Sequence, residues 1–181
     1  MSGSLIHIAS ATTSSNVDTL DIGGSAWDDS YNVYKVVVDN LQSDQTSDIR
    51  LKCRILKSDN SADTSSEYDN ALKGFRSDTG VDDIADVNGT YWSNMTYLFR
   101  GSTSHGACLT MYLFNFNESG EYNYVTIDGV GFGYDGTDLM GACGGGVHTV
   151  AQVAKGLQFL IATDGSEHIS NANINLYGLR K

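Results

Sequence analysis

The sequence predicts an all-β protein, specifically a jelly-roll-like antiparallel β-sandwich that forms a single domain over residues 1–181. Through most of the chain, apolar residues recur at every second position, which is the spacing of a strand with one buried face. Proline is absent and there are 20 glycines, so glycine and small polar residues supply the turns between these stretches. About eight to ten short strands at even spacing are typical of a sandwich or barrel.

The stretch Asp48–Lys57 shows the alternation most clearly. One face carries Ile49, Leu51, Cys53 and Ile55, and the other carries Arg50, Lys52 and Arg54. This pattern indicates a half-buried strand with one solvent-facing side. We expect acidic side chains on neighbouring strands to pair with the three bases.

The remaining expected strands are rich in β-branched and aromatic residues. They are Leu5–Ile8, Val17–Ile22, Tyr31–Leu41, Met95–Phe99, Ala107–Phe116, Tyr122–Tyr134, Leu157–Ala162 and Asn173–Leu179. We expect the terminal strands, residues 5–8 and 173–179, to pair at the centre or edge of the fold. A short helical turn is expected at Asp82–Val87, Val147–Ala154 fits either helix or strand, and Gly144–Gly146 is expected to be a flexible loop tip.

The charge balance excludes several classes of partner. The chain has 22 acidic and 11 basic residues, a formal net charge of −11. Binding to nucleic acid or to anionic lipid requires basic surface, so we expect neither partner. No apolar run is long enough to span a membrane, and the first residues do not form a signal peptide. The three cysteines, Cys53, Cys108 and Cys143, are expected to be reduced, buried thiols of a protein made in a cytosol.

No sequence motif predicts catalysis, a metal or a cofactor. Gly131–Gly136 matches a dinucleotide-binding glycine pattern, but neither the helix nor the later acidic residue that this site needs follows. The four histidines lack metal-ligand spacing and are expected on the surface or in loops. The acidic residues Asp82, Asp83 and Asp86 miss the calcium-loop spacing, which leaves open only a weak calcium site shared with a neighbouring loop.

Tyr91 and Trp92 form the aromatic pair of greatest interest. Exposed rings beside asparagine, aspartate and serine are typical of sugar-binding surfaces, where the ring stacks on the sugar and polar groups bind its hydroxyls. Rings of this kind also occur in β-sandwich cores and at subunit interfaces. All three placements remain open for Tyr91 and Trp92.

The two ends of the chain carry a family resemblance. The residues concerned are Asp28, Asp29, Tyr31, Tyr34, Asn40 and Leu41 near the start and Ile174, Leu176, Tyr177 and Gly178 near the end. They match a pattern of small virion structural proteins of tailed bacteriophages, many from marine and cyanobacterial hosts, and the chain resembles this family. Residues 67–75 fall where the family often has a tyrosine-rich strand.

The resemblance implies a non-enzymatic virion component, either a tail fibre or appendage or a head decoration subunit. It would work as a homo-oligomer, expected to be a trimer, in contact with other virion proteins and with the host surface. Tyr31, Tyr34, Leu176 and Tyr177 are the candidate assembly residues. The alternative is a carbohydrate-binding module that recognises host surface glycan through Tyr91 and Trp92. A glycan-cleaving enzyme ranks third, because no reaction signature is present.

Overall fold

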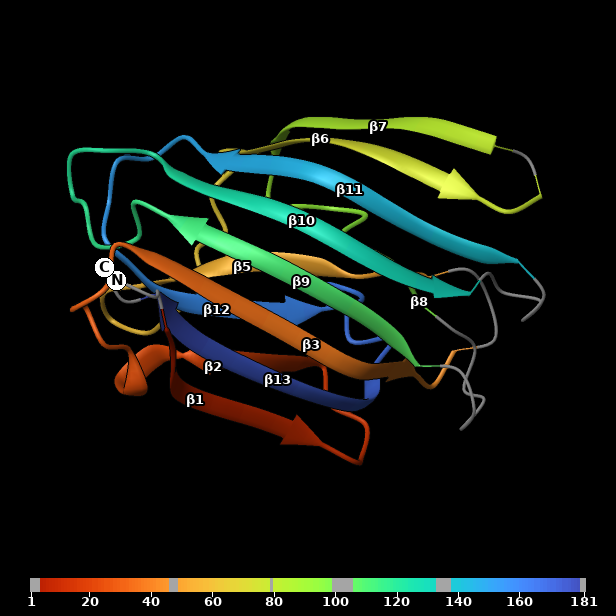
Figure 1. Ribbon diagram of the computed structural model, residues 1–181, viewed down its shortest axis with the longest axis horizontal. Helices are drawn as coiled ribbons and strands as arrows, with labels where there is room; N and C mark the ends of the chain where they lie inside the picture. Colours follow the sequence, from red (N-terminus) through yellow and green to blue (C-terminus); the bar gives the residue numbers. More distant parts are fainter. Residues whose placement is uncertain (1–3, 46–48, 79, 99–105, 133–137, 180–181) are drawn as a thin grey trace.

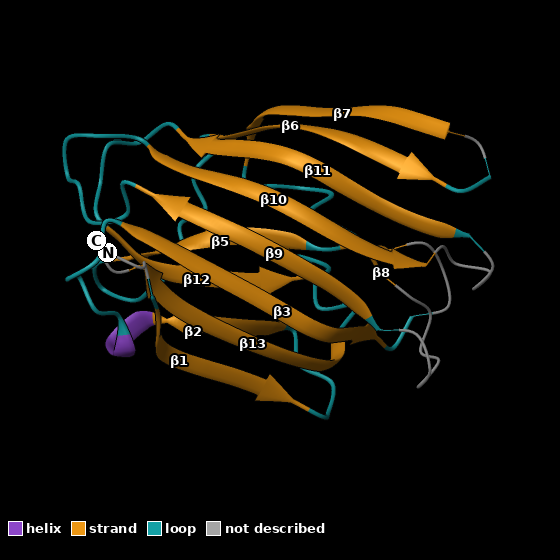
Figure 2. Cartoon of the chain, viewed as in Figure 1, coloured by secondary structure: helices purple, strands orange, loops and turns teal. Residues whose placement is uncertain are grey.

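Strands are the main secondary structure of the computed structural model, which describes residues 4–45, 49–78, 80–98, 106–132 and 138–179 (Figures 1 and 2). In chain order the elements of this described part are β1 (Leu5–Thr13), β2 (Thr19–Gly23), the 3₁₀ turn η1 (Gly24–Ala26), β3 (Val33–Ser43), β4 (Ile49–Arg50), β5 (Lys52–Lys57), β6 (Tyr68–Arg76), β7 (Gly80–Gly89), β8 (Tyr97–Leu98), β9 (Ala107–Phe114), β10 (Asn123–Phe132), β11 (Leu139–His148), β12 (Ala154–Leu160) and β13 (Ile169–Leu179).

The strands form an antiparallel β-sandwich with sheets of unequal size. The large sheet has eight strands in the order β1-β13-β3-β9-β10-β11-β6-β7, and β2-β12-β5 forms a three-stranded sheet behind it (Figure 1). A short β4–β8 pair completes the structure. The predicted all-β sandwich is therefore confirmed. The first and last strands pair at one edge, with Leu5 opposite Leu179, as expected for the terminal strands.

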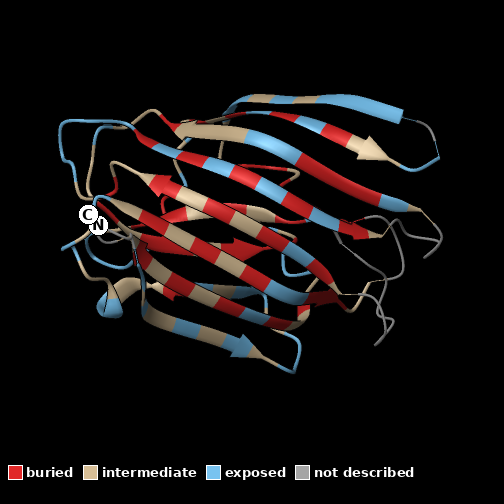
Figure 3. Ribbon diagram, viewed as in Figure 1, coloured by how far each residue is buried: buried red, intermediate tan, exposed pale blue. Residues whose placement is uncertain are grey.

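The core lies between the two larger sheets. Along β3, β9 and β10, buried and exposed residues alternate, so one face of the large sheet packs inward and the other faces solvent (Figure 3). The largest fully buried side chains include Trp92, Tyr34, Tyr68, Phe116 and Phe159. Burying each such side chain contributes on the order of 1.5–3 kcal/mol, so this single cluster dominates the stability of the fold.

A bulge in β3 lies at Asn40 and Leu41. Asn40 has a φ of 52°, in the left-handed region that asparagine tolerates better than most residues. The register with β9 shifts between Val38 and Leu41, so the side-chain parity of the strand changes there. As a result Val38 and Leu41 are both buried although three positions separate them.

Some strand boundaries and one element type differ from expectation. β1 continues to Thr13, beyond the expected end of this strand at Ile8, and β6 forms a strand at the position that the resemblance implied for residues 67–75. The helical turn expected at Asp82–Val87 is wrong, because these residues belong to β7. Both faces of β7 are largely exposed, so its sequence lacks the apolar alternation that normally marks a strand.

The expectation of a flexible loop at Gly144–Gly146 is also wrong. These glycines lie inside β11, paired with β10 on one side and β6 on the other. A Cβ on Gly146 would stand 2.6 Å from Cδ1 of Trp92, so glycine is required by close packing rather than by a turn. Within the described ranges, no helix has the length and apolar character needed to cross a membrane.

Candidate functional site

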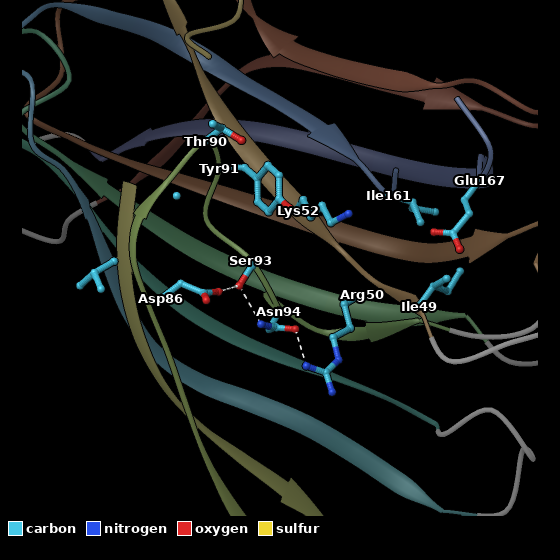
Figure 4. Close-up of a pocket in the computed structure, with 12 residues that line it drawn as sticks. Ile49, Arg50, Lys52, Asp86, Thr90, Tyr91, Ser93, Asn94, Ile161 and Glu167 are labelled. Carbon is cyan, nitrogen blue, oxygen red and sulfur yellow. Dashed lines mark hydrogen bonds between the residues drawn. The ribbon is translucent and has the colours of Figure 1, made fainter. Parts of the chain in front are cut away.

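A groove of about 460 Å³ lies beside the C-terminal end of β7. Its walls are the end of β7, the segment Gly89–Asn94 that follows, and strands β4 and β5, while Ile161 and Glu167 line its other end (Figure 4). The groove brings hydroxyl, amide, ammonium, guanidinium and carboxylate groups to one place. We consider it the candidate ligand-binding site.

The segment after β7 crosses to the second layer of the sandwich and runs along β5. Trp92 and Cys53 exchange two backbone hydrogen bonds of 2.9 and 3.0 Å, and the amide of Met95 donates to the carbonyl of Leu51 at 3.1 Å. Because adjacent side chains of an extended segment point to opposite sides, this pairing turns Trp92 inward and Tyr91 outward toward the groove.

Trp92 is a core residue, so its expected role in stacking on a ligand is corrected. Its exposure is 0%, and its Nε1 donates to the carbonyl of Val147 at 3.1 Å. The ring meets Tyr68 edge-on at a centroid distance of 5.2 Å and covers Gly146. Both the ring face and the indole N–H are thus already engaged inside the protein.

Tyr91 is partly exposed and lines the groove. Nζ of Lys52 lies 5.1 Å from its ring centroid, and Cζ of Arg54 lies 5.8 Å away. Nε of Arg54 also donates to the carbonyl of Thr90 at 3.0 Å. These contacts of Lys52 and Arg54 differ from the expected pairing with acids on neighbouring strands. They hold the tyrosine ring in a fixed, positively charged setting.

A chain of hydrogen bonds orders the polar groups of the groove (Figure 4). Nη1 of Arg50 donates to Oδ1 of Asn94 at 2.6 Å, and Nδ2 of Asn94 donates to Oγ of Ser93 at 2.7 Å. The Ser93 hydroxyl in turn donates to Oδ2 of Asp86. Each side chain is therefore oriented before any ligand arrives, which lowers the entropic cost of binding.

The sequence pattern pointed to only part of this groove. Alternation in β4 and β5 placed Arg50 and Lys52 on the outward face. The sequence singled out Asp86 only as part of an acidic cluster. Asn94 and Glu167 carry no local signal, because the crossing of the sandwich layers brings these residues together. Figure 4 shows Asp86 and Glu167 at opposite ends of the groove, with Arg50 and Lys52 between them.

The candidate assembly residues divide between the core and the surface. Tyr34 and Leu176 are fully buried, which corrects their expected role as subunit contacts. The Tyr34 hydroxyl donates to the carbonyl of Asp28 at 2.7 Å, and burial raises its pKa to about 12. Tyr31 covers Gly178, whose Cβ would lie 2.4 Å from the tyrosine ring. The matching residues at the two ends of the chain therefore meet and stabilise the subunit itself.

Tyr177 is the one candidate on the solvent-facing side of the large sheet. It is partly exposed, and its ring meets His7 edge-on at a centroid distance of 5.5 Å. Neighbouring positions on this half of the sheet are polar, for example Asn175 and Asn173 on the same strand.

On the half of the large sheet formed by β10, β11, β6 and β7, the outer face is apolar at one end. Val130, Phe132, Leu139, Phe75 and Val81 occupy adjacent positions on β10, β11, β6 and β7, and we call these five residues the apolar strip. Val130, Leu139 and Val81 are exposed large hydrophobic residues. Exposed apolar surface shared by several strands is typical of a protein interface.

The remaining charged clusters are structural or dispersed. Asp82 and Asp83 point to opposite faces of β7, and no group of three His, Cys, Asp or Glu residues in the described part could hold a metal ion.

His148 is fully buried, contrary to the expected surface position, and burial lowers its pKa. Of the thiols only Cys53 is buried, and the expectation is wrong for Cys108 and Cys143, which are exposed.

No protein-family model and no curated protein matches the chain. Among solved structures, it is similar to the crystal structure of the marine PL-14 alginate lyase from Aplysia kurodai, with 10% sequence identity and a TM-score of 0.37. The match covers 99% of this chain and 82% of that one. A similarity at this level carries no information about activity or ligand.

Proposed function

We propose that this protein is a non-enzymatic structural subunit of a tailed-bacteriophage particle, which assembles with copies of itself as a trimer. The observation that carries the proposal is the apolar strip on the outer face of the large sheet. A chain with a net charge of −11 stays soluble as a free subunit, whereas five apolar side chains side by side favour burial against another subunit. The family pattern at the two ends of the sequence supports a place in the virion.

Light scattering of the purified protein tests the assembly. We expect a trimer, and we expect Leu139→Glu in the apolar strip to convert it to a monomer that keeps its fold. Leu5→Glu is the matched control, because Leu5 on β1 is similarly exposed, at 49% against 43% for Leu139, but lies on the opposite edge of the sheet. Reductant must be present throughout, since the exposed Cys108 and Cys143 could link copies by disulfides. A wild-type monomer at high concentration would contradict the proposal.

A carbohydrate-binding module is the second candidate, and the groove favours it. The groove combines a partly exposed tyrosine ring with an ordered set of hydrogen-bonding side chains, which is the usual composition of a sugar site. Its two carboxylates lie at opposite ends rather than on either side of one position, an arrangement suited to binding along the groove.

Glycan binding to the wild-type protein and two tyrosine variants tests the second candidate. Tyr91→Ala should abolish binding without loss of fold. Tyr112→Ala is the control, because Tyr112 also lies under a lysine, with Nζ of Lys35 at 5.6 Å from the ring centroid, but lies on the outer face of the large sheet. Equal binding by both variants would remove the groove from consideration.

A further inference from the structure

A second hollow, distinct from the groove and from the apolar strip, lies on the outer face of the large sheet. It has a volume of about 520 Å³, and we call it the trough. Its floor is a row of small residues, Thr126, Gly145, Ala71 and Ala85, which stand opposite one another across β10, β11, β6 and β7. A Cβ on Gly145 would lie 2.8 Å from the carbonyl oxygen of Val125, so the floor stays open at that point.

The trough has apolar walls that the fold leaves exposed. Tyr124 stands at one side and Val87 at the other, and both are among the exposed large hydrophobic residues. A concave, water-exposed apolar surface of this kind favours a ligand that brings apolar side chains.

The trough ends at an open sheet edge. β7 is the last strand of the large sheet, and within the described part of the chain no strand pairs with its far side. An extended segment can therefore add to β7 through main-chain hydrogen bonds. Side chains on the outer face of such a segment would lie beside Ala85 and Val87, next to the trough.

The inner face of β7 determines which side chains are favoured on the other face of an added segment. Asp82 and Asp86 lie on this face, opposite to the face that carries Ala85. Alternate residues of an added segment would stand next to these carboxylates, where basic side chains are favoured and acidic ones are repelled. The occupant is therefore a segment in which apolar residues alternate with lysine or arginine.

A second copy of this chain does not supply such a segment. Its own stretch of alternating apolar and basic residues, Ile49–Lys57, is built into β4 and β5 with its apolar face in the core. Two β7 edges placed side by side would also bring the carboxylates of Asp82 and Asp86 against each other.

We propose that the trough and the open edge of β7 together receive an extended segment of another protein, with apolar residues toward the trough and basic residues toward Asp82 and Asp86. The segment becomes a ninth strand of the large sheet. The trough shares Asp86 and Val87 with the groove and contains no residue of the apolar strip, so this contact can exist whether or not the chain forms a trimer.

Fluorescence anisotropy with a labelled peptide, Lys-Val-Lys-Phe-Lys-Val-Lys, tests the proposal on the full chain. We expect saturable binding that weakens with added salt, and at least ~10-fold weaker binding of the same peptide with glutamate in place of lysine. Tyr124→Ala should weaken binding ~10-fold. Tyr122→Ala is its control, because both tyrosines are 45% exposed and Tyr122 lies outside the trough.

Two further variants separate the charge and shape contributions. Asp82→Asn should weaken binding, whereas Asp128→Asn, on the exposed outer face beyond the trough, should not. Ala85→Phe fills the trough at an exposed position that tolerates a larger side chain, and it should abolish binding. Hydrogen exchange should show amides of β7 protected by the peptide.

Three results would overturn the proposal. The first is equal binding of the basic and acidic peptides, and the second is equal binding by the Tyr124 and Tyr122 variants. The third is self-association of the chain that Ala85→Phe abolishes, which would make a second copy the occupant of the trough.

Discussion

The β3–β13 pair and the β6–β7 edge hairpin of the same sheet differ in almost every physical respect. β3 and β13 pair along most of their length, and every second residue is buried from Tyr34 to Val38 and from Ala172 to Gly178. β6 and β7 also pair closely, yet most of β7 is exposed on both faces (Figure 3). The β3–β13 pair therefore derives its stability from burial, and β7 depends mainly on its hydrogen bonds to β6.

This difference separates the residues that maintain the fold from those that can bind. Tyr34 and Leu176, two residues of the pattern at the two ends of the sequence, belong to the β3–β13 pair and are buried. The groove and the trough both border the end of β7, where Asp86 and Val87 line each of them. Substitutions at the edge can change recognition without unfolding the molecule.

Removal of the Trp92 ring should have the largest effect, because this fully buried ring connects the edge hairpin to β5 of the small sheet. It packs on Tyr68 of β6, and its backbone pairs with Cys53 of β5. We expect Trp92→Ala to lower the free energy of unfolding by about 3–5 kcal/mol, measured by urea denaturation. Tyr91→Ala, one residue away, should cost less than about 1 kcal/mol. Similar losses in the two variants would contradict the inward and outward assignment.

Truncation of a buried side chain in the β3–β13 pair should lower the free energy of unfolding somewhat less than Trp92→Ala does. Leu176→Ala removes a fully buried side chain of β13, and we expect a loss of about 2–5 kcal/mol. Val87→Ala removes an exposed side chain of β7 and should change stability by no more than about 0.5 kcal/mol. Denaturation midpoints of the two variants measured side by side would show whether the regions differ as described.

A methyl group at Gly146 should give a smaller but clear effect. The added Cβ would meet Cδ1 of Trp92 at 2.6 Å, so the ring must shift, at a cost of about 1–3 kcal/mol. Gly120→Ala is the control, because nothing lies within 4 Å of a Cβ at that position. If both variants have wild-type melting temperatures, the close packing of Trp92 on β11 is wrong.

The pH dependence of stability should show the smallest effect. Burial lowers the pKa of His148 from its ordinary 6.5, although Asp63, 3.5 Å from its Nε2, and Glu67 oppose this shift. Below pH 6.5 the unfolded chain therefore binds a proton that the folded chain does not. The contribution of His148 is complete above about pH 6.5 and is lost as the pH falls through the lowered value.

Urea denaturation between pH 5 and pH 8 measures this loss, and His148→Gln should remove it, whereas His7→Gln on the exposed end of β1 should not. A second loss is expected below pH 3.8. Burial alone would raise the pKa of Asp63, but hydrogen bonds from Ser65 and Gln152 outweigh it and lower the pKa. An unchanged pH profile in His148→Gln would assign the first loss to another group.

The sequence was sufficient for the fold class and for strands that bury one face. Alternation marked β5, β9 and β10 because burial on one side and water on the other produce that pattern. It failed for β7, which has water on both faces, and for β11, where Gly144–Gly146 are needed because the Trp92 ring and neighbouring backbone leave no room. The prediction of the site was incomplete for a related reason. Trp92 and Tyr91 are adjacent in sequence, and only the pairing with β5 decides which of the two faces inward.

The pairing of β1 with β13 also has a kinetic consequence. Leu5 lies opposite Leu179, so this edge of the large sheet cannot close until β13 has been synthesised. Contacts between residues so distant in sequence slow folding, because a long loop must be ordered before they form. No proline is present, so no step need wait for prolyl isomerisation. The order in which strands find their partners then sets the pace at which the large sheet closes.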